Sequence, residues 1–358
     1  MNLQSRMRQV AIIARQEARR AFFSKRAFWV YLLALFPAAA FLLHTFEVKV
    51  RVERAKRQGI TDAALVASIR DGETPEQIIA RVGKPNYDRS FTRRRGREEP
   101  AVRYRNLGYF DGARRTDLMF KDGVLERRHT EQFLNLEQDR MIFAGIFQMF
   151  YLRLAIFFGC LGIFMNLFRG EMLDKTLHFW LLAPVRREVL LGGKYAAGLL
   201  ASVLIFTSGA VLGFLAMLAP HGGVEVQSFW SQHGAAHLLR YMLAAALGCA
   251  GYGSVFLAAG LLLRNPIIPA AVLLLWENVS SYLPSMLQRL SVLHYLQAIC
   301  PAPMPIDEGT PALVRLFLQP ADPPSALAAT LGLLVLTALV LLLAARVSRR
   351  LEINYSTE

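Results

Sequence analysis

Six apolar runs, each long enough to form a membrane span, alternate with short segments rich in arginine and lysine. The hydrocarbon core of a bilayer requires about 20 predominantly apolar residues per helix. The run at 266–283 is the shortest of the six and contains Glu277. The pattern therefore predicts an all-α polytopic membrane protein with six transmembrane helices, at residues 27–46, 141–168, 195–219, 238–263, 266–283 and 326–345.

Residues 47–140, between the first two runs, predict a small inserted α+β domain. Residues 61–69 are helical in character, and Thr74-Pro75-Glu76-Gln77 has the form of a capping box that starts a second helix. Lys121-Asp122-Gly123 separates two apolar segments, a pattern typical of a β-hairpin, and residues 101–104 predict a further strand. The expected order is two helices followed by an antiparallel sheet.

The chain carries a formal net charge of +14, and many of its basic residues cluster beside the apolar runs. Short cytoplasmic flanks of membrane proteins are enriched in lysine and arginine. With six spans, the basic segments before the first run, after the second and fourth runs, and after the last run all lie on one side. Both termini are therefore expected in the cytoplasm, and residues 47–140 outside. A cleaved signal peptide is the alternative for the first run, but its basic leader is long and no small-x-small site follows.

Residues 1–26 predict a cytoplasmic amphipathic helix, because Met7, Val10, Ala14 and Ala18 recur at helical spacing. We expect this helix to lie in the membrane interface, with its arginines at anionic lipid head groups. An ordinary soluble helix leading into the first span is the alternative. The arginine-rich run at 93–97 is interpreted as a solvated loop, with lipid head-group or glycan binding as the alternative.

No catalytic motif is recognisable in the sequence. Gly192-Gly193-Lys194 resembles the end of a P-loop, but Glu188 occupies the first glycine position and Tyr195 the position of the magnesium-binding serine or threonine. Neither HExxH nor GxSxG is present. We therefore expect a chain that is not an enzyme and contains no catalytic residue and no cofactor. Its basic residues are assigned to membrane lipid and not to nucleic acid.

The cysteine and histidine residues do not change this expectation. Three cysteines provide no disulfide framework: Cys160, Cys249 and Cys300. Three histidines are enough to bind zinc or copper, but we interpret them as interfacial polar residues and expect no metal site: His221, His233 and His237.

Two charged residues lie deep within the apolar runs, Arg153 in the second and Glu277 in the fifth. An ionisable residue inside a span is costly and usually faces protein or a water-filled cavity, often beside a partner. One interpretation is that Arg153 and Glu277 pair at similar depth. The alternative is that Arg153 extends along its helix to the head groups while Glu277 contacts water near the outer face.

Residues 171–185, after the second run, predict a short amphipathic helix parallel to the membrane surface. Acidic residues stand in its first turn, where the helix dipole favours negative charge. Pro184 ends the helix. A linker helix that only joins two spans is the alternative.

This stretch resembles the permease subunits of ABC-2-type ATP-binding-cassette exporters. The matching residues are Glu171, Thr176-Leu177, Leu181-Leu182-Ala183-Pro184-Val185-Arg186-Arg187 and Leu190-Leu191-Gly192-Gly193-Lys194, with residues 13–20 leading into Phe28-Trp29. The resemblance covers nearly all of the chain outside residues 47–140. The second glycine of Gly192-Gly193 and the inserted domain depart from the family pattern.

The resemblance implies a transport subunit that moves a substrate outward, driven by a separate ATPase subunit that binds ATP and magnesium. A second permease subunit, identical or homologous, would complete the translocation path, and the substrate is not indicated. The implied ATPase-coupling residues are Glu171, Asp174, Lys175, Thr176, Leu177, Leu181, Leu182, Pro184, Arg186 and Arg187. The implied contacts of the N-terminal connecting helix are Arg15, Glu17, Arg19 and Arg20.

Residues 47–140 are similar to the SmpA/OmlA-type domain of outer-membrane assembly lipoproteins. The matching segments are residues 72–77, 83–85 and 118–125. In that family two helices precede a three-stranded sheet, and the domain works in the periplasm. The resemblance implies a fold and a periplasmic compartment for this domain. Together with the six spans and their orientation, it predicts a multi-pass protein of the bacterial cytoplasmic (inner) membrane.

Residues 284–325 are rich in proline and contain two amphipathic pieces, at 286–296 and 313–318. We expect them to dip part-way into the outer leaflet, with their irregular backbone covered by protein. Two other classes of function stay open: a membrane-anchored assembly or scaffold protein whose outer domain binds partners, and a membrane-embedded enzyme. Six spans exceed the needs of an anchor, and no paired catalytic residues favour an enzyme.

Overall fold

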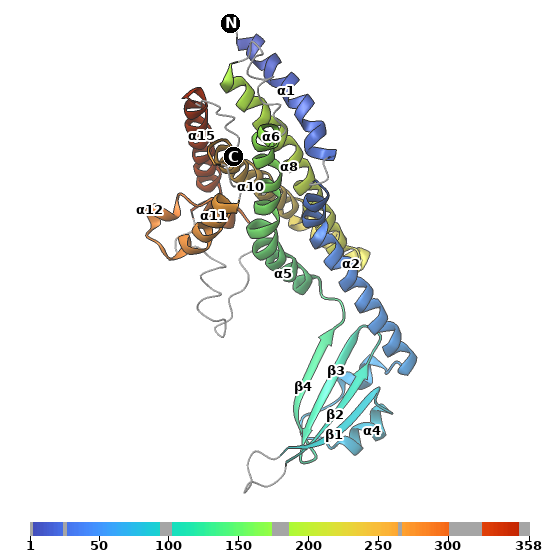
Figure 1. Ribbon diagram of the computed structural model, residues 1–358. Coiled ribbons are helices and arrows are strands. Elements are labelled where there is room, and N and C mark those ends of the chain that lie inside the picture. The colour runs from blue at the N-terminus through green and yellow to red at the C-terminus, as the bar shows by residue number, and fades with distance from the viewer. Residues whose placement is uncertain are drawn as a thin grey trace. The chain divides into compact units, whose positions relative to one another are not determined.

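The computed structural model describes residues 3–23, 27–93, 102–173, 186–263, 267–300 and 324–350. The chain divides into two compact units. The α+β unit consists of Leu42–Asp139 and Ala219–Gly222, and the helical unit of Met1–Phe41, Arg140–Leu218 and Gly223–Glu358. Figure 1 labels the elements of both units.

The sheet of the α+β unit has four antiparallel strands in chain order: β1 (Tyr87–Arg93), β2 (Val102–Phe110), β3 (Arg114–Lys121) and β4 (Val124–Gln132). The predicted hairpin is confirmed, because Asp122 and Gly123 join β3 to β4 with φ angles of 49° and 88°, as a type I′ turn requires. The sheet has one strand more than the three that the resemblance implied. β1 was not predicted because it is exposed along its whole length and lacks an alternating apolar pattern.

Two short helices, α3 (Ala63–Ala67) and α4 (Pro75–Val82), pack against one face of this sheet. The predicted capping box is confirmed: the Thr74 hydroxyl accepts from the Gln77 amide, and the Gln77 side chain accepts from the Thr74 amide. The core between helices and sheet consists of Val66, Ile69, Ile78, Val82, Leu107, Tyr109, Leu118, Phe120 and Leu125.

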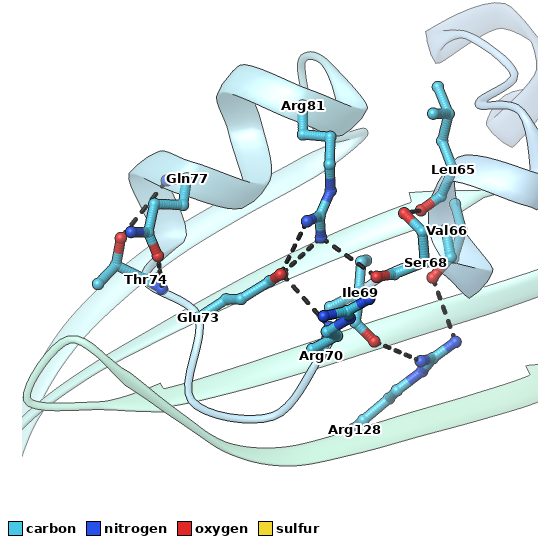
Figure 2. Close-up of polar contacts among 10 residues, drawn as sticks. All are labelled: Leu65, Val66, Ser68, Ile69, Arg70, Glu73, Thr74, Gln77, Arg81 and Arg128. Atoms are coloured by element: carbon cyan, nitrogen blue, oxygen red, sulfur yellow. Dashed lines mark hydrogen bonds and ion pairs between the residues drawn. The ribbon is translucent and has the colours of Figure 1, made fainter.

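Polar contacts fix the helices on that face (Figure 2). Arg128 of β4 donates to the carbonyl oxygens of Val66 and Ile69, each at 3.2 Å. Arg81 of α4 donates to the carboxylate of Glu73, and this hydrogen bond holds the Glu73 pKa below its usual range. One face of the sheet is therefore firmly covered by its own unit.

The helical unit and the segments that enter and leave it form long helices and several short ones (Figure 1). In chain order they are α1 (Leu3–Phe23), α2 (Ala27–Gln58), α5 (Leu136–Ile146), the π-helix η1 (Phe147–Ala155), α6 (Ile156–Leu173), α8 (Arg187–Leu218), α9 (Gly223–Phe229), the π-helix η2 (Trp230–Gly234), α10 (Ala235–Leu262), α11 (Ile267–Val279), the 3₁₀ turn η3 (Ser280–Tyr282), α12 (Ser285–Gln288), α13 (Val292–Ile299) and α15 (Ala326–Arg350).

Within the described part of the chain, five helical segments are long and apolar enough to cross a membrane: α2, α5–η1–α6, α8, α9–η2–α10 and α15. The expected α-rich membrane architecture with a small α+β part is thus confirmed in outline. Six crossings are not: the fifth expected span is α11, which has 13 residues. This length corresponds to about 20 Å, whereas the hydrocarbon core is roughly 30 Å thick.

Small residues allow close packing in the helical unit. A Cβ at Gly209 of α8 would collide with the Ala34 carbonyl of α2, and one at Gly213 would come within 3.2 Å of the Pro37 side chain. These two glycines, four residues apart, therefore pack α8 directly against α2 within the chain. α10 contacts α6, α8 and α15.

Two helices extend beyond the apolar runs expected for them. α6 extends to Leu173, so Glu171 lies in its last turn and does not begin a separate helix. The polar residues of this turn are good helix formers and did not interrupt the helix. α8 begins at Arg187, so the Gly192-Gly193-Lys194 segment is helical.

The amphipathic piece at 286–296 is two helices and not one. Met286 on α12 is exposed, whereas Leu293 and Leu296 on α13 are buried. The break is at Ser291, whose hydroxyl accepts from the His294 amide and caps α13. The second amphipathic piece, at 313–318, lies outside the described residues.

Candidate functional site

A buried lysine near the start of α8 joins three segments of the helical unit. Lys194 Nζ lies 2.9 Å from Glu17 Oε1 of α1 and 2.7 Å from the carbonyl oxygen of Leu167 in α6. The side chain of Lys194 is 0% exposed and that of Glu17 is 4% exposed. A buried charge is tolerated only where it is paired and hydrogen-bonded. The contact therefore fixes α1 onto the bundle.

A glycine next to this lysine allows α1 to approach α8. A Cβ at Gly193 would lie 2.7 Å from Ile13 Cγ2 and 3.3 Å from the Val10 carbonyl oxygen, whereas one at Gly192 would meet nothing within 4 Å. Ile13 is buried among Val189 and Leu190. The second glycine, which departs from the family pattern, is thus the position where α1 and α8 touch.

The end of α15 meets the start of α8 in the same unit. Arg187 donates to the carbonyl oxygens of Ser348 and Arg349 at 3.1 and 3.4 Å, which satisfies acceptors at a helix C-terminus. Arg349 also pairs with Glu188. Residues predicted to be cytoplasmic, after the second and the last apolar run, therefore lie side by side.

These contacts involve only some of the expected coupling and connecting residues. Glu17 and Arg187 take part, whereas Arg15 and Arg186 are exposed. Glu171 is in α6, and Arg19 and Arg20 are in α1, but the structure does not describe their side chains. The other expected coupling residues lie outside the described residues: Asp174, Lys175, Thr176, Leu177, Leu181, Leu182 and Pro184.

The partnership of Glu17 with Lys194 was not predicted. The sequence contains two hints: Glu17 is the only acidic residue before the first apolar run, and Lys194 is followed by more than 25 uncharged residues. Each suggests a buried charge that needs a partner, but neither identifies that partner.

A second polar cluster lies inside the bundle around Glu277. Its carboxylate accepts from the Ser291 hydroxyl at 2.5 Å and from the amides of Val292 and Leu293, both at 3.1 Å. These donors form the start of α13, where unpaired amides and the helix dipole favour a carboxylate. Glu277, which is 3% exposed, therefore ties α11 to α13.

The other deep charge, Arg153, lies on the π-helix η1 and is also buried. Its guanidinium interacts electrostatically with Glu277 and with Tyr252 of α10. The hydrogen-bond partners of Glu277 among the described residues are Ser291 and the α13 amides, so Arg153 acts on the carboxylate at longer range. π-Helices inside spans are frequent at functional positions.

One of the histidines considered for metal binding has another partner. In the α+β unit, His221 Nε2 lies 2.9 Å from Asp139 Oδ2, and His44 Nε2 lies 3.5 Å from Asp139 Oδ1. Among the described residues, no group of three or more His, Cys, Asp or Glu side chains is arranged to hold a metal ion.

Comparison with models of protein families finds none that matches this chain, and comparison with curated proteins finds no match either. The resemblances to ABC-2-type permeases and to SmpA/OmlA-type domains therefore rest on the residues quoted for them.

Proposed function

We propose that this chain is the permease subunit of an ATP-driven exporter of the ABC-2 type. It would reside in the bacterial cytoplasmic membrane with both termini in the cytoplasm, and it would work with a separate ATPase subunit and a second permease subunit. The observation that carries the proposal is the anchoring of α1 to α8 and α6 through Glu17, Lys194 and Leu167.

This anchoring would transmit movement of the ATPase subunits to the transmembrane helices, as an ATPase-driven permease requires. The segment 174–185 follows α6 and precedes α8 in the chain, and α1 is fixed to both helices by one buried ion pair. A displacement of α1 or of this segment by closing ATPases would therefore move α6 and α8 together. A buried pair of this kind adds little net stability but is costly to break, so it would keep the three helices together while they move.

In this proposal the membrane is crossed six times, and the fifth crossing is made by a shortened helix. α11 would cross from the cytoplasmic side into the outer leaflet, where η3 would turn the chain. α13 would then dip part-way into the outer leaflet, buried against α10 and α15. The hydrogen bonds of Glu277 to the start of α13 would then satisfy backbone amides at membrane depth, which irregular backbone in a bilayer requires.

The proposal is tested by uncoupling variants in the complex isolated from native membranes. Lys194→Met, which breaks the link, and Arg186→Glu, which reverses an exposed charge after segment 174–185, should each reduce permease-stimulated ATP hydrolysis or ATPase binding about tenfold, the effect of roughly 1.4 kcal/mol. Arg346→Glu, an exposed charge on α15, is the matched control. Unchanged ATPase binding and stimulation in correctly inserted variants would contradict the proposal and favour a scaffold.

A further inference from the structure

The sheet of the α+β unit has a second face, opposite α3 and α4. Strand register places paired residues of this face in rows that cross the sheet. One row consists of Arg89, Asn106, Met119 and Arg127, and the next of Phe91, Tyr104, Lys121 and Val124. Arg93 continues the face on β1. We call these rows, with Arg93, the basic sheet face.

The basic sheet face contains four cationic side chains and no carboxylate. Arg89, Arg93, Lys121 and Arg127 are all exposed. The acidic residues of the same sheet side, Asp117 and Glu131, pair in register with His129 and Arg115 farther along the strands, and Asp117 also forms an ion pair with Arg115 at 3.0 Å. Among the described residues of the unit, none of the four cations of the face forms an ion pair.

Aromatic rings lie in the middle of these charges. Phe91 and Tyr104 are stacked with ring centroids 5.4 Å apart and an interplanar angle of 18°, and Phe91 is 42% exposed. Met119 lies half-buried in the adjacent row. A stacked pair on a paired sheet holds its rings in place before a partner arrives, which lowers the entropy lost on binding.

We propose that the basic sheet face is a docking surface for an acidic surface of a partner protein. Aromatic residues, methionine and arginine are the types that protein interfaces concentrate, whereas lysine is depleted there; three of the four cations of this face are arginines. Four strands spaced about 4.8 Å apart, over five residues of about 3.3 Å each, give a backbone area of roughly 300 Å². An area of this size fits a transient protein contact.

Other occupants fit the face less well. In a contact between two copies of this face, the four cations of one copy would lie against the four cations of the other. Like charges placed together at an interface typically cost several kcal/mol. A bilayer surface binds segments that insert large apolar side chains such as Trp and Leu, whereas the rows of this face contain neither Trp nor Leu. The proposal is independent of the transport function proposed above.

The test is photo-cross-linking of the full-length protein in its native membrane. A benzophenone-bearing phenylalanine analogue replaces Phe91, and the same analogue at Leu65, which lies on α3 at the covered side, is the positional control. The Phe91 probe should form a discrete adduct with a protein, at a peptide with an excess of Asp and Glu. The adduct should fall about tenfold in Arg89→Glu or Arg127→Glu, the loss expected when an interface arginine is reversed.

Arg114→Glu is the matched charge control, because Arg114 is exposed on the same sheet but on the opposite side. This variant should keep the adduct. Raising the salt concentration to about 1 M, where the Debye length is about 3 Å, should remove the adduct of the Phe91 probe in the protein without charge reversals; this measurement needs no charge-reversal variant to fold. An adduct with lipid or glycan alone, no Phe91-specific protein adduct, or a protein adduct that resists both salt and charge reversal would overturn the proposal.

Discussion

Lys194 and Glu277 are two buried charges of the helical unit. Lys194 directly precedes the third apolar run and Glu277 lies within the fifth, and each has at least two hydrogen-bond partners from other segments. Lys194 joins α1 to α6 and α8, and Glu277 joins α11 to α13. Buried charges held in this way stabilise one arrangement of helices at the expense of others.

Removing Lys194 should strongly destabilise the helical unit. In Lys194→Met, Glu17 is left buried without its cation, which typically costs about 3–5 kcal/mol. The double variant Glu17→Leu with Lys194→Met should regain part of this loss, because no charge is then stranded. Arg349→Ala, which removes an exposed partner of Glu188, should change stability by about 1 kcal/mol or less. The free energy of unfolding in detergent is measured for the parent protein and these three variants. A Lys194→Met variant as stable as the parent would rule out this role of the ion pair.

Glu277→Gln should destabilise the α11–α13 connection by about 1–3 kcal/mol, because an amide nitrogen would face donors that need an acceptor. The reciprocal exchange of Arg153 and Glu277 should not restore stability, since an arginine cannot accept from Ser291 or from the α13 amides. Thermal unfolding of the single variants and of the exchange in detergent gives the comparison. Recovery in the exchange would mean that a direct pair with Arg153 dominates.

At the scale of the elements, two adjacent glycines of α8 test its contact with α1. Gly193 faces Ile13 and Val10 of α1, whereas Gly192 faces open space. The same substitution at the two positions changes helix propensity equally, so a difference between them reports the α1 contact.

Gly193→Val should therefore be less stable than Gly192→Val by about 1–3 kcal/mol, the usual range for overpacking. α1 should also lose protection from hydrogen exchange in Gly193→Val, and it should keep this protection in Gly192→Val. Equal stability and equal protection in the two variants would show that α1 does not rest on α8 as described.

The sequence predicted the elements that carry strong local patterns. The capping box at Thr74, the turn at Asp122-Gly123 and the long apolar helices are confirmed because their residues determine local backbone geometry. β1 was missed because its exposed residues carry no periodic apolar signal. The burial of Ile13 and Glu17 of α1 was not predicted, because the helix was expected in the membrane interface and not packed against other helices.

The candidate site was harder to predict than the fold, because it depends on pairs of residues far apart in the chain. Glu17 and Lys194 are separated by 177 positions, and sequence pattern alone does not say which distant charges meet. The pairing considered for Arg153 and Glu277, as one of two interpretations, rested on estimated depth alone. The depth of a residue along a helix does not determine the rotation of that helix about its axis. This rotation decides which neighbour a side chain faces, and Glu277 faces Ser291.

At the scale of the whole molecule, the orientation that we propose puts the α+β unit outside and the end of α15 inside. Val124→Cys, 54% exposed on β4, should react with an impermeant thiol reagent in intact cells. Arg346→Cys on α15 should react only after permeabilisation. The native cysteines, all free and buried, are replaced beforehand to remove background. Labelling of Val124→Cys only after permeabilisation would reverse the topology.

The central claim is that this chain is a permease driven by a separate ATPase, and subunit composition tests it most directly. The full-length protein is extracted from its native membrane in mild detergent, and the intact complex is weighed by native mass spectrometry with identification of its subunits. We expect a P-loop ATPase in a one-to-one ratio with the permease subunits, two of each, and ATP hydrolysis by the complex. A complex without any P-loop protein, or a lone chain inserted in the membrane, would contradict the account.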